Sequence, residues 1–459
     1  MREGRYFQGT IWDVLRNDEE LPPGLEEARE FLACLEECDG DLVRALELER
    51  GHGRDDYPAR AMWRFMAVCL FLRHGRFSQM LGELRRSRDL ARLLGFNEPL
   101  PNRFVLPPAY VVSRFHGKLK EERYRLLLKQ IHVKTVGLAR QEDPTIGQHA
   151  AGDATDVRTH GHAARKEGEE EERPATDPDA SWSVKTKRWE DSQGRQREEK
   201  KSTFGYKAFL MVDVFKPVVL AEETKTGSTS DQTMAEPMLE ATVRNVGEGV
   251  LKSVSMDKGF DSTETVEEGN AQGVKMLIPV REVSKDLKQQ PAENREKPLK
   301  EGGNVVWDSY SGEVACYAPA EGGGVVRRTM QYAGYESQRE SHKFRCPLGG
   351  LAATACSAFA TCSAGDCGKL GKQVRVPMKT DARRFAPVYP LSKQWKRKYN
   401  GRTAVERVNS YLKEVLRLEE HCLRGKAAIA LRVTLAAVTI NLRTLMVLRE
   451  AKSLAKAAA

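Results

Sequence analysis

The stretch YNGRTAVERVNSYLK, residues 399–413, places Tyr399, Arg402, Glu406 and Lys413 at gaps of three, four and seven residues. At ~100° per residue, these four side chains would share one face of a helix. One interpretation is a solvated helix with an ordinary Arg402–Glu406 pair at i, i+4. The other is a carboxylate set among groups that bind phosphate. The rest of the chain has to decide between them.

The composition predicts a soluble globular protein. The chain has 459 residues, 30% of them charged and 40% hydrophobic, which is enough for two or three domains with cores. The N-terminus MREGRYFQGT lacks the apolar segment of a secretory signal. The most apolar run, 427–448, contains Arg432, Asn441 and Arg443, so we expect a buried helix and no membrane contact. Nine cysteines, an odd number, favour a reducing cytoplasm without a disulfide framework.

Basic residues are concentrated in two segments. Residues 380–413 hold nine Lys and Arg against two acids, and residues 60–92 hold eight Arg against two acids. Such clusters are typical of surfaces that face nucleic acid, although solubility alone is the other explanation. Aromatic residues that could stack on bases interleave the first cluster: Phe385, Tyr389, Trp395 and Tyr399.

The pattern along the chain predicts four regions. Residues 1–145 are expected to form an all-helical N-terminal domain, in which FSQMLGELRRSRDLARLLGF (77–96) is one helix capped by Ser78 and ended by Gly95. Residues 146–280 have the order β-β-β-α-β-α-β of a mixed α/β sheet, interrupted by a polar, mostly irregular excursion at 163–202. Residues 281–392 are expected to form a β-rich, Cys-containing insertion. Residues 393–459 are expected to form the helical C-terminal part of the core.

Three acids stand out in this order of elements. We expect Asp153 at the end of the first strand, Asp257 at the end of the fourth, and Glu406 on a helix beyond the insertion. Converging carboxylates repel one another unless cations neutralise them, and Mg²⁺ prefers such oxygen ligands. Two ions about 3.5–4 Å apart can activate an attacking oxygen and stabilise the leaving oxygen of a phosphodiester.

These motifs resemble the DDE transposases of bacterial insertion sequences, in the group with a Y-x2-R-x3-E-x6-K signature. The quoted stretch meets that signature at all four positions. AGDATDV resembles the first-Asp motif and SMDKGFDS the second, while DDYPARAMWRFMAVCLFLRHGRFSQMLGELRRSRDLARLLGF resembles the N-terminal helical domain. The resemblance implies a ribonuclease H-like catalytic core with an insertion between the second Asp and the Glu.

The resemblance also implies roles for individual residues. Asp153, Asp257 and Glu406 match the metal-binding triad, which takes two Mg²⁺ ions or substitute Mn²⁺. Tyr399, Arg402 and Lys413 match the partners that contact DNA phosphates, and Trp307 in NVVWDSY matches an insertion aromatic that holds a flipped base. A place in a small hydrophobic core is the alternative for Trp307.

Two further acids compete with the first two members of the triad. Asp156 follows Asp153 by three residues. Asp153 is preferred because, with Thr155, it keeps the D-x-T pattern of the first-Asp motif. Asp261 lies near Asp257, and we interpret it as the cap of the next helix.

Four cysteines of the insertion have the spacing C-x9-C-x5-C-x4-C: Cys346, Cys356, Cys362 and Cys367. Four thiolates could bind a structural Zn²⁺, with His342 as a spare ligand. The usual C-x2-C pairs are missing, so a set of reduced thiols is the alternative.

The resemblance therefore implies a bacterial, cytoplasmic and nucleoid-associated DNA transposase. It would bind terminal inverted repeats of double-stranded DNA as a homodimer on paired ends, cleave the ends and join the 3′-hydroxyls to target DNA. Two alternatives remain open: a domesticated DNA-binding protein that does not cleave, and a metal-dependent nuclease without strand transfer.

Overall fold

The computed structural model describes residues 25–50, 56–99, 104–164, 174–281, 290–301, 303–319, 324–348, 367–368 and 371–457. The chain forms two compact units. The first unit consists of Met1–Ser230, Pro237–Leu251 and Thr403–Ala459, and the second of Asp231–Glu236 and Lys252–Arg402. The boundary between the units thus falls inside the stretch 399–413.

Helices form the N-terminal part of the first unit: α2 (Glu26–Glu36), α3 (Gly40–Arg50), α4 (Ala59–Phe71), α5 (Phe77–Arg86), α6 (Arg88–Leu94), α7 (Ala109–Leu119) and α8 (Glu122–Glu142). The single helix expected over 77–95 is wrong. The chain breaks at Ser87, whose hydroxyl accepts a hydrogen bond from the Leu90 N–H at 3.2 Å and so caps α6. Ser78 is not a cap, because α5 begins at Phe77. Gly95 ends α6 with φ of +86°, as its left-handed preference predicts.

Four antiparallel strands follow in the first unit: β1 (His149–Arg158), β2 (Ser181–Glu190), β3 (Gln196–Asp213) and β4 (Val219–Thr226). Strand β3 pairs with each of the other three. The irregular excursion expected over 163–202 is wrong from 181 onward, because β2 and the outer half of β3 form a ribbon there. The Asp191 carboxylate closes its turn by accepting the N–H groups of Gln193 and Arg195, each at 2.9 Å.

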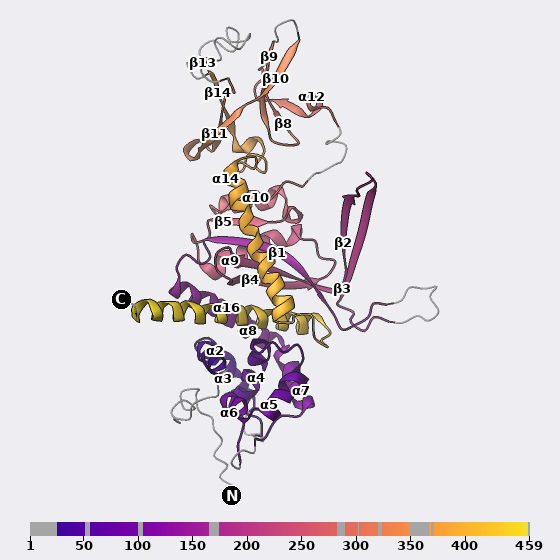
Figure 1. Ribbon diagram of the computed structural model, residues 1–459, viewed down its shortest axis with the longest axis vertical. Coiled ribbons are helices and arrows are strands. Elements are labelled where there is room, and N and C mark those ends of the chain that lie inside the picture. The colour runs from indigo at the N-terminus through magenta and orange to yellow at the C-terminus, as the bar shows by residue number, and fades with distance from the viewer. Residues whose placement is uncertain are drawn as a thin grey trace. The chain divides into compact units, whose positions relative to one another are not determined.

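Helix α16 (Lys426–Ala457) lies across the sheet and the N-terminal helices of the first unit (Figure 1). By length and composition alone it could cross a membrane, but 78% of its most apolar window is buried. Its Asn441 is buried and binds both backbone groups of Val219, with Oδ1 accepting at 2.7 Å and Nδ2 donating at 3.0 Å. One hydrophobic core joins this helix, the sheet and α2–α7, so position 145 does not separate two cores.

The second unit begins with the parallel strands β5 (Ser253–Met256) and β6 (Lys275–Leu277), connected by α10 (Thr263–Ala271). Two small antiparallel sheets follow. The first contains β7 (Glu296–Pro298), β8 (Val305–Asp308), β9 (Val314–Pro319) and β10 (Val325–Thr329), and the second contains β11 (Gln331–Glu336), β12 (Ser341–Arg345), β13 (Cys367–Gly368) and β14 (Gly371–Pro377).

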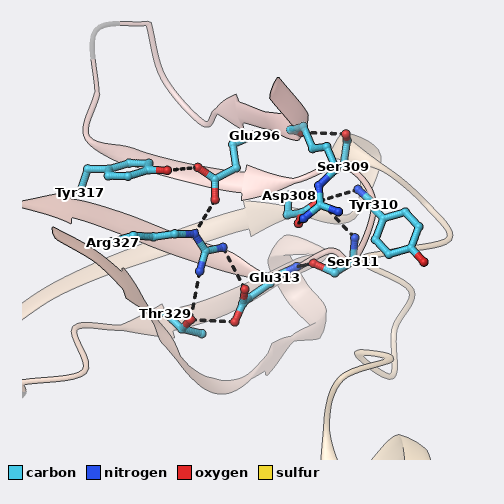
Figure 2. Close-up of polar contacts among 10 residues, drawn as sticks. Glu296, Asp308, Ser309, Tyr310, Ser311, Glu313, Tyr317, Arg327 and Thr329 are labelled. Atoms are coloured by element: carbon cyan, nitrogen blue, oxygen red, sulfur yellow. Dashed lines mark hydrogen bonds and ion pairs between the residues drawn. The ribbon is translucent and has the colours of Figure 1, made fainter. Parts of the chain in front are cut away.

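An ion-pair network connects the strands of the first small sheet (Figure 2). The guanidinium of Arg327 lies between two carboxylates, with Nε donating to Glu296 at 2.6 Å and Nη2 to Glu313 at 2.9 Å. Tyr317 also donates to Glu296, and Thr329 donates to Glu313 at 2.7 Å. The Glu296 side chain is only 3% exposed, so a neutral residue in place of Arg327 would leave a buried charge without its partner.

Buried histidines make the stability of the first unit dependent on pH. His132 of α8 is buried and shares a hydrogen bond of 2.8 Å with the carbonyl oxygen of Val219. Burial lowers its pKa to about 4, and the bond to the carbonyl only partly offsets this. In the unfolded chain the pKa returns to ~6.5, so the unfolded state binds more protons between these values.

We therefore expect the free energy of unfolding to fall as the pH drops from 6.5 to 4. In His132→Gln, whose amide can still donate to Val219, this fall should be smaller by about 2–3 kcal/mol at pH 4. Urea unfolding of both proteins across this pH range measures the difference. Parallel curves for the two proteins would show that His132 is not held neutral.

Candidate active site

Strand β1 and helix α15 (Thr403–Ser410) carry the two acids of the predicted triad that belong to the first unit, Asp153 and Glu406. Asp153 lies in the middle of β1, opposite Leu210 of β3, so its expected place at the strand end is wrong. Its Oδ2 accepts a hydrogen bond of 3.1 Å from Nδ2 of Asn409. Asn409 follows Glu406 by three residues, so both lie on neighbouring positions of one helix face. The exposed Glu406 therefore projects from the side of α15 that contacts Asp153.

Asn409 is the residue of this site that the sequence analysis missed. The only available signal was its spacing, one helical turn after Glu406 on the same face. Its side-chain oxygen is buried and accepts no hydrogen bond from the residues that the structure describes. Asn409 thus joins α15 to β1 through its nitrogen and presents an oxygen beside the Asp153 carboxylate.

The neighbouring Asp156 has a different environment. Residues three apart on a strand point to opposite faces, so Asp156 points away from the face of Asp153. Its carboxylate lies 2.9 Å from Nζ of Lys185 on β2. Burial would raise its pKa, but the hydrogen bonds with Lys185 and Ser183 lower the pKa below its usual value. This ion pair favours Asp153 over Asp156 as the partner of Glu406.

Lys413 also connects the C-terminal helices with β1. It lies on the π-helical turn η7 (Tyr411–Val415), and its Nζ donates to the carbonyl oxygen of Asp156 at 2.8 Å. Glu419 lies 3.4 Å from the same nitrogen. An ammonium group has three donors. The expected phosphate contact of Lys413 stays a prediction.

The second unit carries Asp257, which directly follows β5 as the sequence predicts. Its Oδ1 accepts the N–H of Lys258 at 2.8 Å and caps the 3₁₀ turn η2 (Lys258–Phe260), while the side chain stays exposed.

Asp261, in contrast, is buried and already has partners. The cap of α10 is Ser262, whose hydroxyl accepts the Thr265 N–H at 3.0 Å, so the expected capping role of Asp261 is wrong. Asp261 accepts the Arg281 N–H at 2.7 Å and Nη1 of Arg383 at 3.1 Å. Burial raises its pKa, against the effect of these donors. Asp257 is therefore the more accessible of these two acids.

The motif 399–413 is not one regular helix. Helix α14 (Lys393–Tyr399) is followed by the 3₁₀ turn η6 (Asn400–Arg402), then by α15 and by the π-helical turn η7. The expectation of one regular helix across the motif is therefore wrong.

Tyr399 and Arg402 belong to an aromatic–cationic group in the second unit. The ring of Tyr399 stacks on Trp395, with centroids 4.6 Å apart and an angle of 13°. The guanidinium carbon of Arg402 lies 6.0 Å from the Tyr399 ring centroid, within cation–π range.

Trp307 packs in the core of the strand-rich part of the second unit. It is 6% exposed and contacts Phe385 edge-on, with ring centroids 5.5 Å apart. Phe385 and Tyr389 are buried in the same core, so they do not interleave the basic surface as the sequence suggested. This burial favours the packing alternative for Trp307, and its role in holding a base stays a prediction.

Three of the four predicted zinc ligands cannot be placed. Cys356, Cys362 and the side chain of Cys367 lie outside the described residues. Cys346 is a half-buried free thiol. Both ring nitrogens of the spare ligand His342 have other partners, the hydroxyl of Tyr332 at 3.3 Å and the carbonyl oxygen of Phe385 at 3.0 Å. Within the described parts of the chain, no three His, Cys, Asp or Glu residues form a group that could hold a metal.

The donor atoms of the first unit nevertheless fit a hard divalent cation. Asp153 and Glu406 would supply carboxylates, and the buried Asn409 oxygen, which accepts no hydrogen bond from the described residues, would supply a neutral ligand. Mg²⁺ and Mn²⁺ favour such oxygen ligands.

The family model described as Transposase DDE domain matches residues 145–442. The cryo-EM structure of the piggyBac transposase synaptic complex with hairpin DNA is similar at a TM-score of 0.39 and 13% sequence identity, over 90% of this chain and 74% of that chain. No curated protein matches the sequence.

The contact between Asp153 and Asn409 can be tested through stability. Asn409→Asp would place two carboxylates within hydrogen-bond distance, which raises the pKa of the pair. We expect a loss of about 1–3 kcal/mol at neutral pH that shrinks as the pH falls and the pair takes up a proton. Added Mg²⁺ should restore stability as well.

Chemical unfolding at neutral and mildly acidic pH, with and without Mg²⁺, measures this loss. Asn409→Ala is the control, since it removes the same hydrogen bond without adding charge. Equal pH and Mg²⁺ responses in both variants would contradict the proposed proximity.

Proposed function

The chain belongs to the family of transposases with a DDE domain, and from this premise we propose that it is a DNA transposase that cleaves the ends of a mobile element and joins them to target DNA. The family match spans the strand, the turn and the helix that carry Asp153, Asp257 and Glu406. The observation that carries the proposal is the Asp153–Asn409 hydrogen bond, which turns the Glu406 face of α15 toward β1.

We assign Asp153, Asp257 and Glu406 to the binding of divalent cations. Bound cations would polarise the scissile phosphate and lower the pKa of an attacking water or 3′-hydroxyl. Asn409 keeps the Asp153 carboxylate in one orientation and holds α15 in its rotation about the helix axis. Asp156, neutralised by Lys185, stays outside the reaction.

Tyr399 and Arg402 are proposed to contact the DNA backbone beside the cleaved bond. A guanidinium forms two parallel hydrogen bonds with phosphate oxygens, which fixes the position as well as the charge of the strand. Stacking on Trp395 restricts the orientation of the Tyr399 ring. The cation–π contact with the face of this ring in turn restricts the position of the Arg402 guanidinium. Terminal inverted repeats are the proposed specific substrate, with two copies of the chain acting on two paired ends.

The assignment predicts different outcomes for neighbouring acids. Asp153→Asn, Asp257→Asn and Glu406→Gln should each lower single-turnover DNA cleavage by roughly 100-fold or more in Mg²⁺, because each loses a charged ligand. Binding to the same DNA should stay near the wild-type level. The substrate is a plasmid carrying the DNA that flanks the gene on both sides.

Asp156→Asn is the matched control and should cleave near the wild-type rate. Loss of cleavage in Asp156→Asn with retention in Asp153→Asn would show that the first ligand is misassigned. Transfer of the cleaved 3′ end to a second, labelled plasmid tests the joining step. Cleavage without any joined product would make the protein a nuclease instead.

A further inference from the structure

A pocket of about 580 Å³ in the first unit lies between the loop after α4 and the turn after η7. Three arginines line it, Arg73, Arg86 and Arg417, together with Ser78 and Gln79 from the first turn of α5. The pocket does not include Asp153, Asn409 or Glu406. Its lining is therefore separate from the carboxylates of the candidate active site.

Two of these arginines have a left-handed backbone. Arg73 has φ of +63° and Arg417 has φ of +53°. In the described part of the chain, Glu340 is the only other non-glycine residue with positive φ. Such conformations cost free energy and persist where the surrounding structure imposes them, often at binding sites. Two of these three residues meet at one pocket and carry the same charged group.

The surrounding structure does impose this geometry. The backbone of Gly75 comes so close to the 417–420 turn that a Cβ there would lie 2.4 Å from the carbonyl oxygen of Glu420. The buried Arg432 donates to the carbonyl oxygens of Arg417 at 2.7 Å and Leu418 at 2.9 Å. Burial lowers the pKa of Arg432 to about 10, so it stays charged at neutral pH and holds the turn. The loop and the turn are thus fixed against each other before any ligand binds.

The charges of the pocket are only partly compensated. Among the arginines of segment 60–92, Arg64 pairs with Glu36, whereas Arg73 and Arg86 are exposed and form no ion pair within the described residues. The nearby carboxylates already have partners. Glu83 pairs with His74, and Glu420 lies 3.0 Å from Nη1 of Arg417.

We propose that this pocket binds backbone phosphates of duplex DNA, away from the cleaved bond. This inference rests on the proposed function, since it takes DNA as the partner. A guanidinium group binds phosphate oxygens through two parallel hydrogen bonds, and the first turn of α5 adds the Ser78 hydroxyl and the positive end of a helix dipole. The left-handed backbone holds the Cα atoms of Arg73 and Arg417 at fixed positions, so little backbone entropy is lost on binding.

The test uses the full chain and a labelled duplex of unrelated sequence, with affinity measured by fluorescence anisotropy across a salt series. The pocket variant combines Arg73→Asn and Arg86→Gln. Asn tolerates a left-handed backbone and Gln is a good helix former, so the fold is not put at risk. The control combines Arg85→Gln and Arg88→Gln, which remove the same charge from exposed neighbours outside the pocket.

We expect the pocket variant to bind about 10-fold more weakly at moderate salt. The slope of log affinity against log salt should fall by about one to two units, since each lost phosphate contact contributes ~0.9. The control variant should bind within about twofold of wild type. Thermal melting of each protein verifies that the variants are folded.

The outcomes separate this inference from the proposed function. Equal losses of DNA affinity in both double variants would indicate a general basic surface and would overturn the inference. An unchanged affinity in the pocket variant would also overturn it, even if the protein cleaves DNA. A pocket-dependent affinity in a protein that never cleaves would uphold the inference and contradict the proposed function. A wild-type protein without affinity for duplex DNA would contradict both, and the cleavage assay would show the second failure independently.

Discussion

The hydrogen bond between Asn409 and Asp153 connects residues 256 positions apart, and the geometry of the candidate site in the first unit depends on it. The chain has to return from the strand-rich segment before this bond can form. Lengthening a loop costs only ~0.6 kcal/mol per doubling, whereas burying an aliphatic side chain contributes ~1.5–3 kcal/mol. Val405 and Val408 are both buried in the core, so apolar packing supplies most of the energy that docks α15. The hydrogen bond, worth about 1 kcal/mol, instead sets the rotation of the helix and the direction of Glu406.

The strand and the helix of this contact could be predicted from residue patterns, but their internal geometry could not. Asp153 was expected at a strand end, yet β1 continues to Arg158 because β3 still offers it a partner at Gly205. The 3₁₀ turn at 400–402 and the π turn at 411–415 interrupt a stretch whose residue spacing fits one regular helix, so the spacing did not predict them. Likewise, the polar ribbon of β2 and β3 lacks a buried face along its outer half, so hydrophobic alternation gave no signal there.

Charge counts located the basic segments but could not say which charges are available to a ligand. The local sequence around Arg64 does not distinguish it from the other arginines of this segment. Its side chain is nevertheless 2% exposed and forms an ion pair with Glu36. Arg73, nine residues later, is exposed. The difference depends on an acid almost thirty residues upstream, and no local pattern reports it. The same limit applies to the aromatic residues, because Phe385 is in a core while Trp395 stacks on Tyr399 at the surface.

The Y-R-E-K motif is contiguous in the sequence, and the boundary between the two units runs through it. The unit boundary lies between Arg402 and Thr403, so the phosphate-binding candidates Tyr399 and Arg402 belong to one unit and Glu406 to the other. Four residues of extended chain span at most about 14 Å, so the chain itself keeps Arg402 within that distance of Glu406. Asp257 has no such covalent tether to α15, because it lies 149 residues before Glu406 in the sequence. The sequence spacing alone therefore fixes the proximity of Arg402 and Glu406, whereas no spacing fixes that of Asp257.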